Sequence, residues 1–207
     1  PNSFIDEIDK SDDYYIPVWE DVISMLESVP QVIDIGCGSG KFSSFLYKNF
    51  KTSLIGIDGN EYALEKAKLN GFEKTFIVKD FNKDQLPLKD QSHELVFCKD
   101  VLEHLLDPIF LLWQINKIMK TGGKLLVHVP NHFPILGRIK FLLNNNIDPF
   151  GYCLGSNLWD LPHIRFYTYQ SLDEMLLLSG FKIVKDLSYH FPAIPLSSKF
   201  NFIQKNI

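Results

Sequence analysis

The sequence predicts an α/β fold, namely a doubly wound, mostly parallel sheet of seven strands with helices on both faces. Short apolar runs typical of buried parallel strands alternate with segments whose apolar residues recur at helical spacing. A glycine-rich loop directly follows the first apolar run, as in many such folds. The chain has 207 residues, 45% of them hydrophobic, which is enough for the core of one such domain. We therefore expect residues 1–207 to form a single domain.

The predicted strands are short and are bounded mainly by glycine, proline or aspartate. They cover residues 32–35, 53–57, 75–78, 94–98, 124–129 and 182–187. A seventh segment, 200–203, is irregular and is either a last strand or a frayed end. Helical spacing predicts helices at 18–26, 42–46, 63–67, 109–119 and 171–178, the fourth of which ends at Gly122-Gly123.

Two regions and the first residue depart from this pattern. Residues 131–168 combine prolines, asparagines and aromatics without a regular period, so we expect an insert after strand five that folds over the carboxyl edge of the sheet. Because the last strand is irregular, we expect a truncated C-terminus that leaves the edge of strand five exposed. The chain begins at Pro1 rather than Met, which indicates a processed, trimmed or partial polypeptide.

Composition argues against several classes of protein. The formal net charge of −4 gives no electrostatic footprint for nucleic-acid binding. No apolar run approaches the roughly 20 residues of a membrane helix, and no secretory signal region is present. The three cysteines lack both paired spacing and metal-ligand spacing. We therefore expect a cytoplasmic protein that binds no nucleic acid, no membrane and no metal.

A loop with three glycines separates the first predicted strand from the next helix. Gly36, Gly38 and Gly40 let the backbone approach a ligand closely, and the start of the helix offers unpaired N–H groups. A dinucleotide-binding loop carries its third glycine one position later, where this chain has Lys41. Asp34, at the end of the strand, would repel a pyrophosphate and attract an ammonium or sulfonium group. These features disfavour a nicotinamide- or flavin-dependent dehydrogenase.

Two further acids end the next two predicted strands. Asp58 lies about 20 residues beyond the glycines, the separation at which a carboxylate meets a ribose diol. Asp80 ends the third strand and is followed by Phe81, which together provide an acceptor and a ring suited to an adenine. The three acids therefore indicate a ligand that contains a nucleoside and a cationic group.

These motifs resemble those of class I S-adenosylmethionine-dependent methyltransferases over roughly residues 30–190. The matching segments are 32–40 for the glycine motif, 54–58 for the ribose motif and 78–81 for the adenine motif, followed by 100–108, 120–125, 163–167 and 179–181. Segment 100–108 is similar to the small-molecule branch of types 11 and 12. Residues 129–131, 137–138, 142–143 and 159–166 are partly similar to the methionine biosynthesis protein W group.

The resemblance implies a Rossmann-like sheet and S-adenosylmethionine as the cofactor, with S-adenosylhomocysteine as the product and no metal. It implies that the glycine loop passes against the methionine tail, that Asp58, beside Gly59, binds both ribose hydroxyls, and that Asp80 and Phe81 bind the adenine.

The resemblance also implies residues around the transferred methyl group. Lys99 and Val101 would line the methyl side at the end of strand four. Tyr15 would close over the cofactor, although a plain packing role is at least as compatible with its position.

His104, just past strand four, is the first candidate for a general base. His132 and His163 are second candidates on the substrate side, and Arg165 is suited to pair a substrate carboxylate or phosphate. Taken singly, these last three are more typical of structural or surface residues.

The leading interpretation is an enzyme that transfers a methyl group to an oxygen or nitrogen of a small polar acceptor. A saccharide is the preferred acceptor class, because the insert mixes aromatics, histidines and amides. The alternative is a non-catalytic, cofactor-binding subunit that regulates another enzyme, which leaves a protein partner open. A dehydrogenase is disfavoured by Lys41 and Asp34, and a nucleic-acid methyltransferase by the acidic charge balance.

Overall fold

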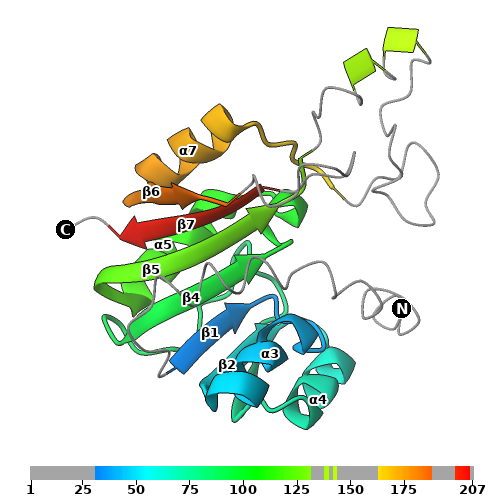
Figure 1. Cartoon of the computed structure of the whole chain (residues 1–207), viewed down its shortest axis with the longest axis vertical. Helices are drawn as coiled ribbons and strands as arrows, with labels where there is room; N and C mark the ends of the chain where they lie inside the picture. The colour runs from blue at the N-terminus through cyan, green and yellow to red at the C-terminus, as the bar shows by residue number, and fades with distance from the viewer. Residues whose placement is uncertain (1–30, 132–137, 140–141, 144–162, 188–198, 206–207) are drawn as a thin grey trace.

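A computed structural model describes residues 31–131, 138–139, 142–143, 163–187 and 199–205 (Figure 1). The helix predicted at 18–26, Tyr15, His132 and most of the predicted insert lie outside these residues. The single domain and the insert therefore stay predictions.

A seven-stranded sheet in the order β3-β2-β1-β4-β5-β7-β6 forms the centre of the fold (Figure 1). Its strands are β1 (Gln31–Ile35), β2 (Ser53–Asp58), β3 (Lys74–Ile77), β4 (His93–Lys99), β5 (Met119–Val129), β6 (Phe181–Asp186) and β7 (Lys199–Lys205). The first five strands are joined by parallel pairs, whereas β7 runs antiparallel to both β5 and β6. The prediction of a mostly parallel sheet is confirmed for these five strands, and the last two pairings are antiparallel.

Helices cover both faces of the sheet, as predicted. They are α3 (Lys41–Phe50), α4 (Glu61–Leu69), α5 (Pro108–Ile118) and α7 (Tyr169–Leu178), with a short 3-10 helix, η2 (Leu102–His104), after β4. Because side chains alternate along a strand, the buried residues divide into two clusters. The cluster against α3 and α4 includes Val32, Leu46, Leu54, Ala67, Phe72 and Phe97. The cluster against α5 and α7 includes Ile33, Ile55, Val96, Leu112, Ile115, Leu172 and Leu176.

The helix predicted at 109–119 ends earlier than expected. α5 stops at Ile118, and β5 begins at Met119. Met119 leaves the helix because it pairs with His93 of β4, and the register then shifts before Lys124 pairs with Leu95. Gly122 and Gly123 therefore lie within an irregular part of the strand and do not end the helix.

The expectation of an exposed edge beside the fifth strand is wrong. β7 pairs with residues 124–129 of β5 and lies between β5 and β6 in the sheet. The segment at 200–203 is part of this strand, so it is not a frayed end. Its direction explains why the sequence pattern was ambiguous, because an antiparallel strand has no crossover helix before it to mark its position.

One carboxylate is buried between β1 and α3. The Asp34 side chain points toward α3, where the Ser43 hydroxyl donates a 2.6 Å hydrogen bond to its Oδ2 atom. Asp34 is only 3% exposed. Burial raises the pKa of Asp34 from 3.8 to about 7, against the lowering effects of the Ser43 hydrogen bond and the Lys99 charge.

The buried Asp34 predicts a pH-dependent stability. The folded state holds the proton of the Asp34 carboxyl group more tightly than the unfolded chain does. The protonated group therefore stabilises the fold at low pH, and this stabilisation is lost as the pH rises from 3.8 to about 7. Relative to Asp34→Asn, the wild-type free energy of unfolding should fall by about 2–3 kcal/mol between about pH 5 and pH 8. Urea unfolding at both pH values measures this change. The control Asp90→Asn removes an exposed carboxylate, and its free energy of unfolding should stay within about 0.5 kcal/mol of the wild-type value at both pH values. If the free energies of wild type and Asp34→Asn change in parallel with pH, the prediction is wrong.

Candidate functional site

The glycine loop lies between β1 and α3, at the carboxyl edge of the parallel strands (Figure 1). Gly36, Gly38 and Gly40 all have left-handed backbones, with φ of 69°, 53° and 76°. A Cβ on Gly36 would lie 2.3 Å from a methyl carbon of Val101, and one on Gly40 would lie 2.3 Å from the Phe72 ring. A Cβ on Gly38 would meet no heavy atom of the described residues within 4 Å. The outer two glycines are therefore required by packing, and the middle one borders open space that no described residue fills.

Asp58, at the end of β2, is bonded to the glycine loop. Its Oδ2 atom accepts a 2.8 Å hydrogen bond from the Gly38 N–H. Its Oδ1 atom accepts another, also of 2.8 Å, from the N–H of Asn60, which caps α4. Asp58 is partly exposed, so its carboxylate lies beside the open space at Gly38. Gly59 packs closely against the backbone that follows β3, since a Cβ there would lie 3.3 Å from the Val78 carbonyl oxygen.

Asp80 lies in the turn beyond β3, which ends at Ile77, and its carboxylate is used within that turn. Oδ1 accepts hydrogen bonds from the backbone and side-chain amides of Asn82, and Oδ2 lies 3.3 Å from the Lys83 ammonium. The Asn82 hydrogen bonds, with help from Lys83, lower the pKa of Asp80. Phe81 is partly buried and packs against the core. The roles of both residues in adenine binding stay predictions.

A charged network that the sequence reasoning missed lies at the ends of β4 and β5. The carboxylate of Asp100 contacts both the Lys99 ammonium and Nδ1 of the buried His128. Burial alone would raise the pKa of Asp100, but the neighbouring His128 and Lys99 outweigh it and hold the pKa below its usual range. Burial also lowers the pKa of His128. The backbone of Asp100 is left-handed, with φ of 54°, which is uncommon outside glycine.

A signal for this network was present in the sequence but was weak. His128 interrupts the apolar, buried second half of β5, residues 125–129, and it pairs with Lys99 in the sheet register. A polar residue in such a strand needs a partner, but only the register identifies which one.

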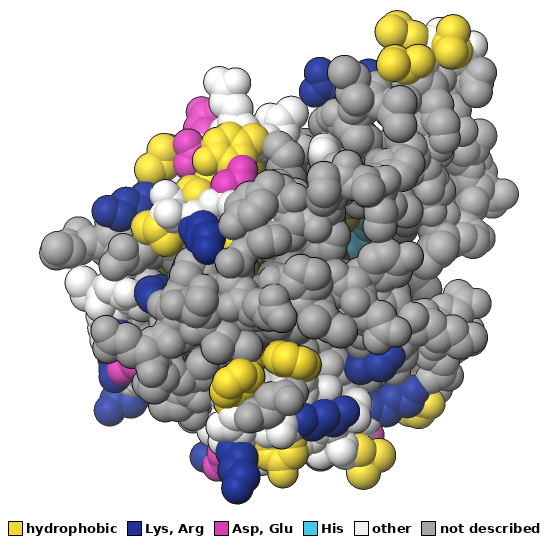
Figure 2. All heavy atoms as spheres, viewed as in Figure 1, with side chains coloured by type: hydrophobic (Ala, Val, Ile, Leu, Met, Phe, Trp, Pro, Cys, Tyr) yellow, Lys and Arg dark blue, Asp and Glu magenta, His cyan; other side chains and the backbone are white. Residues whose placement is uncertain are grey.

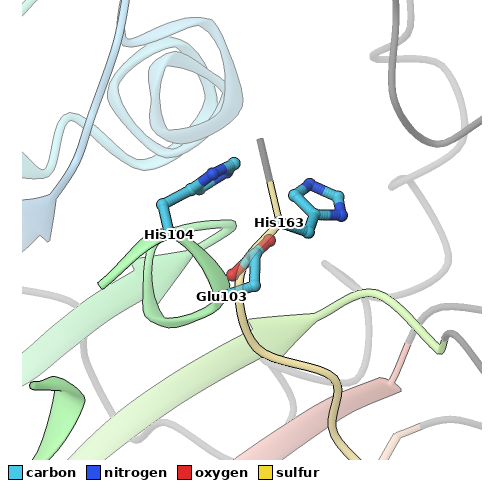
Figure 3. Close-up of side chains that lie close together, drawn as sticks. All are labelled: Glu103, His104 and His163. Atoms are coloured by element: carbon cyan, nitrogen blue, oxygen red, sulfur yellow. The ribbon is translucent and has the colours of Figure 1, made fainter. Parts of the chain in front are cut away.

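Three candidate side chains meet beyond β4 (Figure 3). Glu103 and His104 come from η2, and His163 comes from the segment before α7. The rings of His104 and His163 are 4.8 Å apart between centroids. Glu103 is fully buried, and burial with the nearby Asp100 charge raises its pKa well above its usual range. The structure thus brings together two histidines that were separate candidates in the sequence, and it adds Glu103.

Arg165 holds the two segments together. Its Nε donates a 2.9 Å hydrogen bond to the Leu105 carbonyl, and Nη2 donates to the Leu106 carbonyl. The backbone N–H groups of Ile164 and Arg165 both donate to the Glu103 carbonyl. The guanidinium therefore already supports local structure, and its pairing with a substrate anion stays a prediction.

The surface of the described residues is mixed in character. Figure 2 shows basic, acidic and hydrophobic side chains interspersed over the described elements on this face. Within the described part of the chain, no helix combines the length and apolar character needed to cross a bilayer.

Comparison with known sequences places the chain among methyltransferases. The profile of a family described as a methyltransferase domain matches residues 14–186. Phosphoethanolamine N-methyltransferase 3 of Arabidopsis thaliana is 30% identical over 114 residues, which are 52% of this chain and 23% of the relative. Ubiquinone biosynthesis O-methyltransferase of Hahella chejuensis is 28% identical over 124 residues, which are 57% of this chain and 51% of the relative. The chain thus matches about half or less of the length of these relatives.

Solved structures have the same fold. A SAM-dependent methyltransferase of Methanosarcina mazei gives a TM-score of 0.66 at 20% identity, covering 90% of this chain and 97% of that one. A second match is one chain of the complex between the Haloferax volcanii Trm112 methyltransferase activator and the putative methyltransferase. It gives a TM-score of 0.62 at 16% identity, covering 88% of this chain and 85% of that one. Since the family profile spans most of the sequence, including the glycine loop and Asp58, the chain belongs to the methyltransferase-domain family of class I S-adenosylmethionine-dependent methyltransferases.

Proposed function

We propose that this protein transfers a methyl group from S-adenosylmethionine to an oxygen or nitrogen of a small polar acceptor. The observation that carries the proposal is the open space at Gly38 beside a carboxylate, Asp58, that the loop itself holds in place. A nucleoside with a ribose diol fits such a carboxylate, which keeps lone pairs for two hydroxyl donors. The two relatives named above act, by their names, on a nitrogen and on an oxygen acceptor. Composition favours a saccharide as the acceptor class.

The chain's own residues would mainly bind and orient the reactants. When bound, S-adenosylmethionine supplies an electrophilic methyl group on a positively charged sulfur. The glycine loop and Asp58 would fix its ribose, and Lys99 and Val101 would border the methyl side, since Val101 packs directly on Gly36. Alignment of acceptor and methyl group, with water excluded, supplies much of the rate enhancement.

A hydroxyl acceptor must also lose a proton. His104 is exposed at the end of η2, close to Val101, so an imidazole nitrogen there is well placed to accept it. His163 and His132 would lie on the substrate side. The proposed cofactor site also includes Asp34, Asp80, Phe81 and Tyr15. The Asp34 charge would attract the sulfonium group from beneath the glycine loop.

A second candidate function is a cofactor-binding subunit that acts through a protein partner. The likeness to a chain solved in complex with a methyltransferase activator favours keeping this candidate. Cofactor binding is common to both candidates. Release of S-adenosylhomocysteine with a suitable acceptor would favour the enzyme.

The cofactor assignment predicts tight binding of S-adenosylhomocysteine that depends on Asp58. Loss of two hydrogen bonds to the ribose in Asp58→Ala should weaken binding by about 1–3 kcal/mol, or roughly five- to 150-fold. Calorimetry on wild type, Asp58→Ala and the exposed control Asp90→Ala measures this effect, with NADH as a second ligand. Equal affinity in all three proteins would refute the role of Asp58. Binding of NADH without S-adenosylhomocysteine would refute the cofactor itself.

The open space at Gly38 predicts that a side chain there weakens ligand binding, whereas a side chain at another left-handed glycine lowers stability alone. Gly38→Ala places a methyl group where the ligand is expected and should weaken S-adenosylhomocysteine binding about tenfold or more. The matched control Gly180→Ala has a similar left-handed backbone, with φ of 82°, but lies between α7 and β6. Both variants should lose about 1–2 kcal/mol of stability from backbone strain, and Gly180→Ala should lose more because its Cβ would lie 2.9 Å from Nδ2 of Asn116. If both retain wild-type affinity, the ligand does not occupy this space.

A further inference from the structure

The Glu103 carboxylate lacks the partners that a buried acid normally has. Its residue is 0% exposed, and neither Oε1 nor Oε2 has a hydrogen-bond partner among the described residues. Burying a carboxylate without donors or a counter-charge is costly, so such groups are nearly always paired or bound to a metal. Among the described residues no donor is bonded to this carboxylate, so a cation bound after β4 would satisfy it.

Two imidazoles lie beside this carboxylate. One ligand atom from each of Glu103, His104 and His163 falls within 4.8 Å of the others, and Figure 3 shows the carboxylate close to both rings. The two segments are tied together, because the Glu103 carbonyl accepts hydrogen bonds from the backbone of residues 164 and 165. The backbone thus holds His163 near Glu103 and His104, although His163 lies far from these two adjacent residues in the sequence.

We propose that Glu103, His104 and His163 form a binding site for one divalent transition-metal ion, with Zn²⁺ as the best-matched ion. Two imidazole nitrogens and one carboxylate oxygen are the protein ligands of many zinc sites that keep an open coordination position. Mg²⁺ and Ca²⁺ prefer sets made of oxygen atoms, so they suit this cluster less well. Ligands of a tetrahedral zinc lie about 3.3 Å apart. The three ligand atoms lie within 4.8 Å of one another, so they must move closer to bind one ion, and the exposed His104 ring is the one best able to rotate.

A metal here would change how an acceptor hydroxyl is activated. With His104 as a ligand, its imidazole is not a free base. The open coordination position would instead hold a water or acceptor oxygen and lower the pKa of that group. The sequence alone predicted no metal, from the spacing of its cysteines and from the family resemblance. It gave no signal for this cluster, because His163 is distant from Glu103 in the chain. The site does not depend on the proposed function, since metal binding is measured without cofactor or acceptor.

The test is a metal titration of the full chain after treatment with a chelator. Calorimetry with ZnCl₂, and visible absorption with CoCl₂ as a spectroscopic probe, should both show one ion per chain. Glu103→Gln, His104→Ala and His163→Ala should each bind Zn²⁺ about tenfold or more weakly. A hundredfold excess of MgCl₂ should not displace the zinc.

Matched controls remove the same side-chain types elsewhere. His93→Ala and Glu94→Gln lie at the opposite end of β4 and should bind Zn²⁺ as wild type does. His104→Ala alters an exposed side chain, so its fold should survive even where the buried Glu103→Gln is unstable, and circular dichroism checks each variant. The proposal fails if wild type binds no Zn²⁺ at tens of micromolar, or if the three cluster variants bind it as tightly as the controls. S-adenosylhomocysteine binding by the metal-free protein separates this failure from a failure of the proposed function.

Discussion

The ring of Phe72 fills space that exists only because two glycines lack a Cβ. A Cβ on Gly40 or on Gly56 would lie within 2.8 Å of this ring. Phe72 is 5% exposed and belongs to the core beneath α3 and α4. The glycine loop is therefore fixed on the edge of β2, and this position lets the Gly38 N–H reach Asp58. The candidate cofactor site depends on this close packing of ring and backbone.

Two carboxylates near the site show how partners determine charge. Among the described residues, Asp34 accepts a hydrogen bond from the Ser43 hydroxyl, and burial raises its pKa to about 7. Asp100 contacts an ammonium and an imidazole, which hold its pKa low. The charge of Lys99 lowers the pKa of both acids, but its ammonium group contacts Asp100 directly. The carboxyl edge of the sheet thus carries one acid that is easily protonated, Asp34, and one that stays ionised, Asp100. Asp100 lies in the chain between Lys99 and Val101, the residues expected to border the methyl group.

The elements that the sequence predicted well are those with local signals. The strands before the glycine loop and before Asp58 are short apolar runs, and the glycine spacing itself indicated a ligand loop. The end of α5 was misplaced because pairing of Met119 with His93 overrides the helical period. The contact of Asp100 with His128, and the cluster of Glu103 with His163, depend on sheet register and on segments far apart in sequence, which no local pattern records.

The position of β7 also sets an order for folding. The strand lies between β5 and β6, yet it is the last of the three in the chain. On a ribosome, β6 would emerge before the strand that joins it to the rest of the sheet. Until residues 199–205 are synthesised, β5 has an unpaired edge and β6 has no neighbour, so the nascent chain would present an open strand to other proteins. Pairing of β7 with β5 and β6 thus joins β6 to the rest of the sheet only after all three strands have been made.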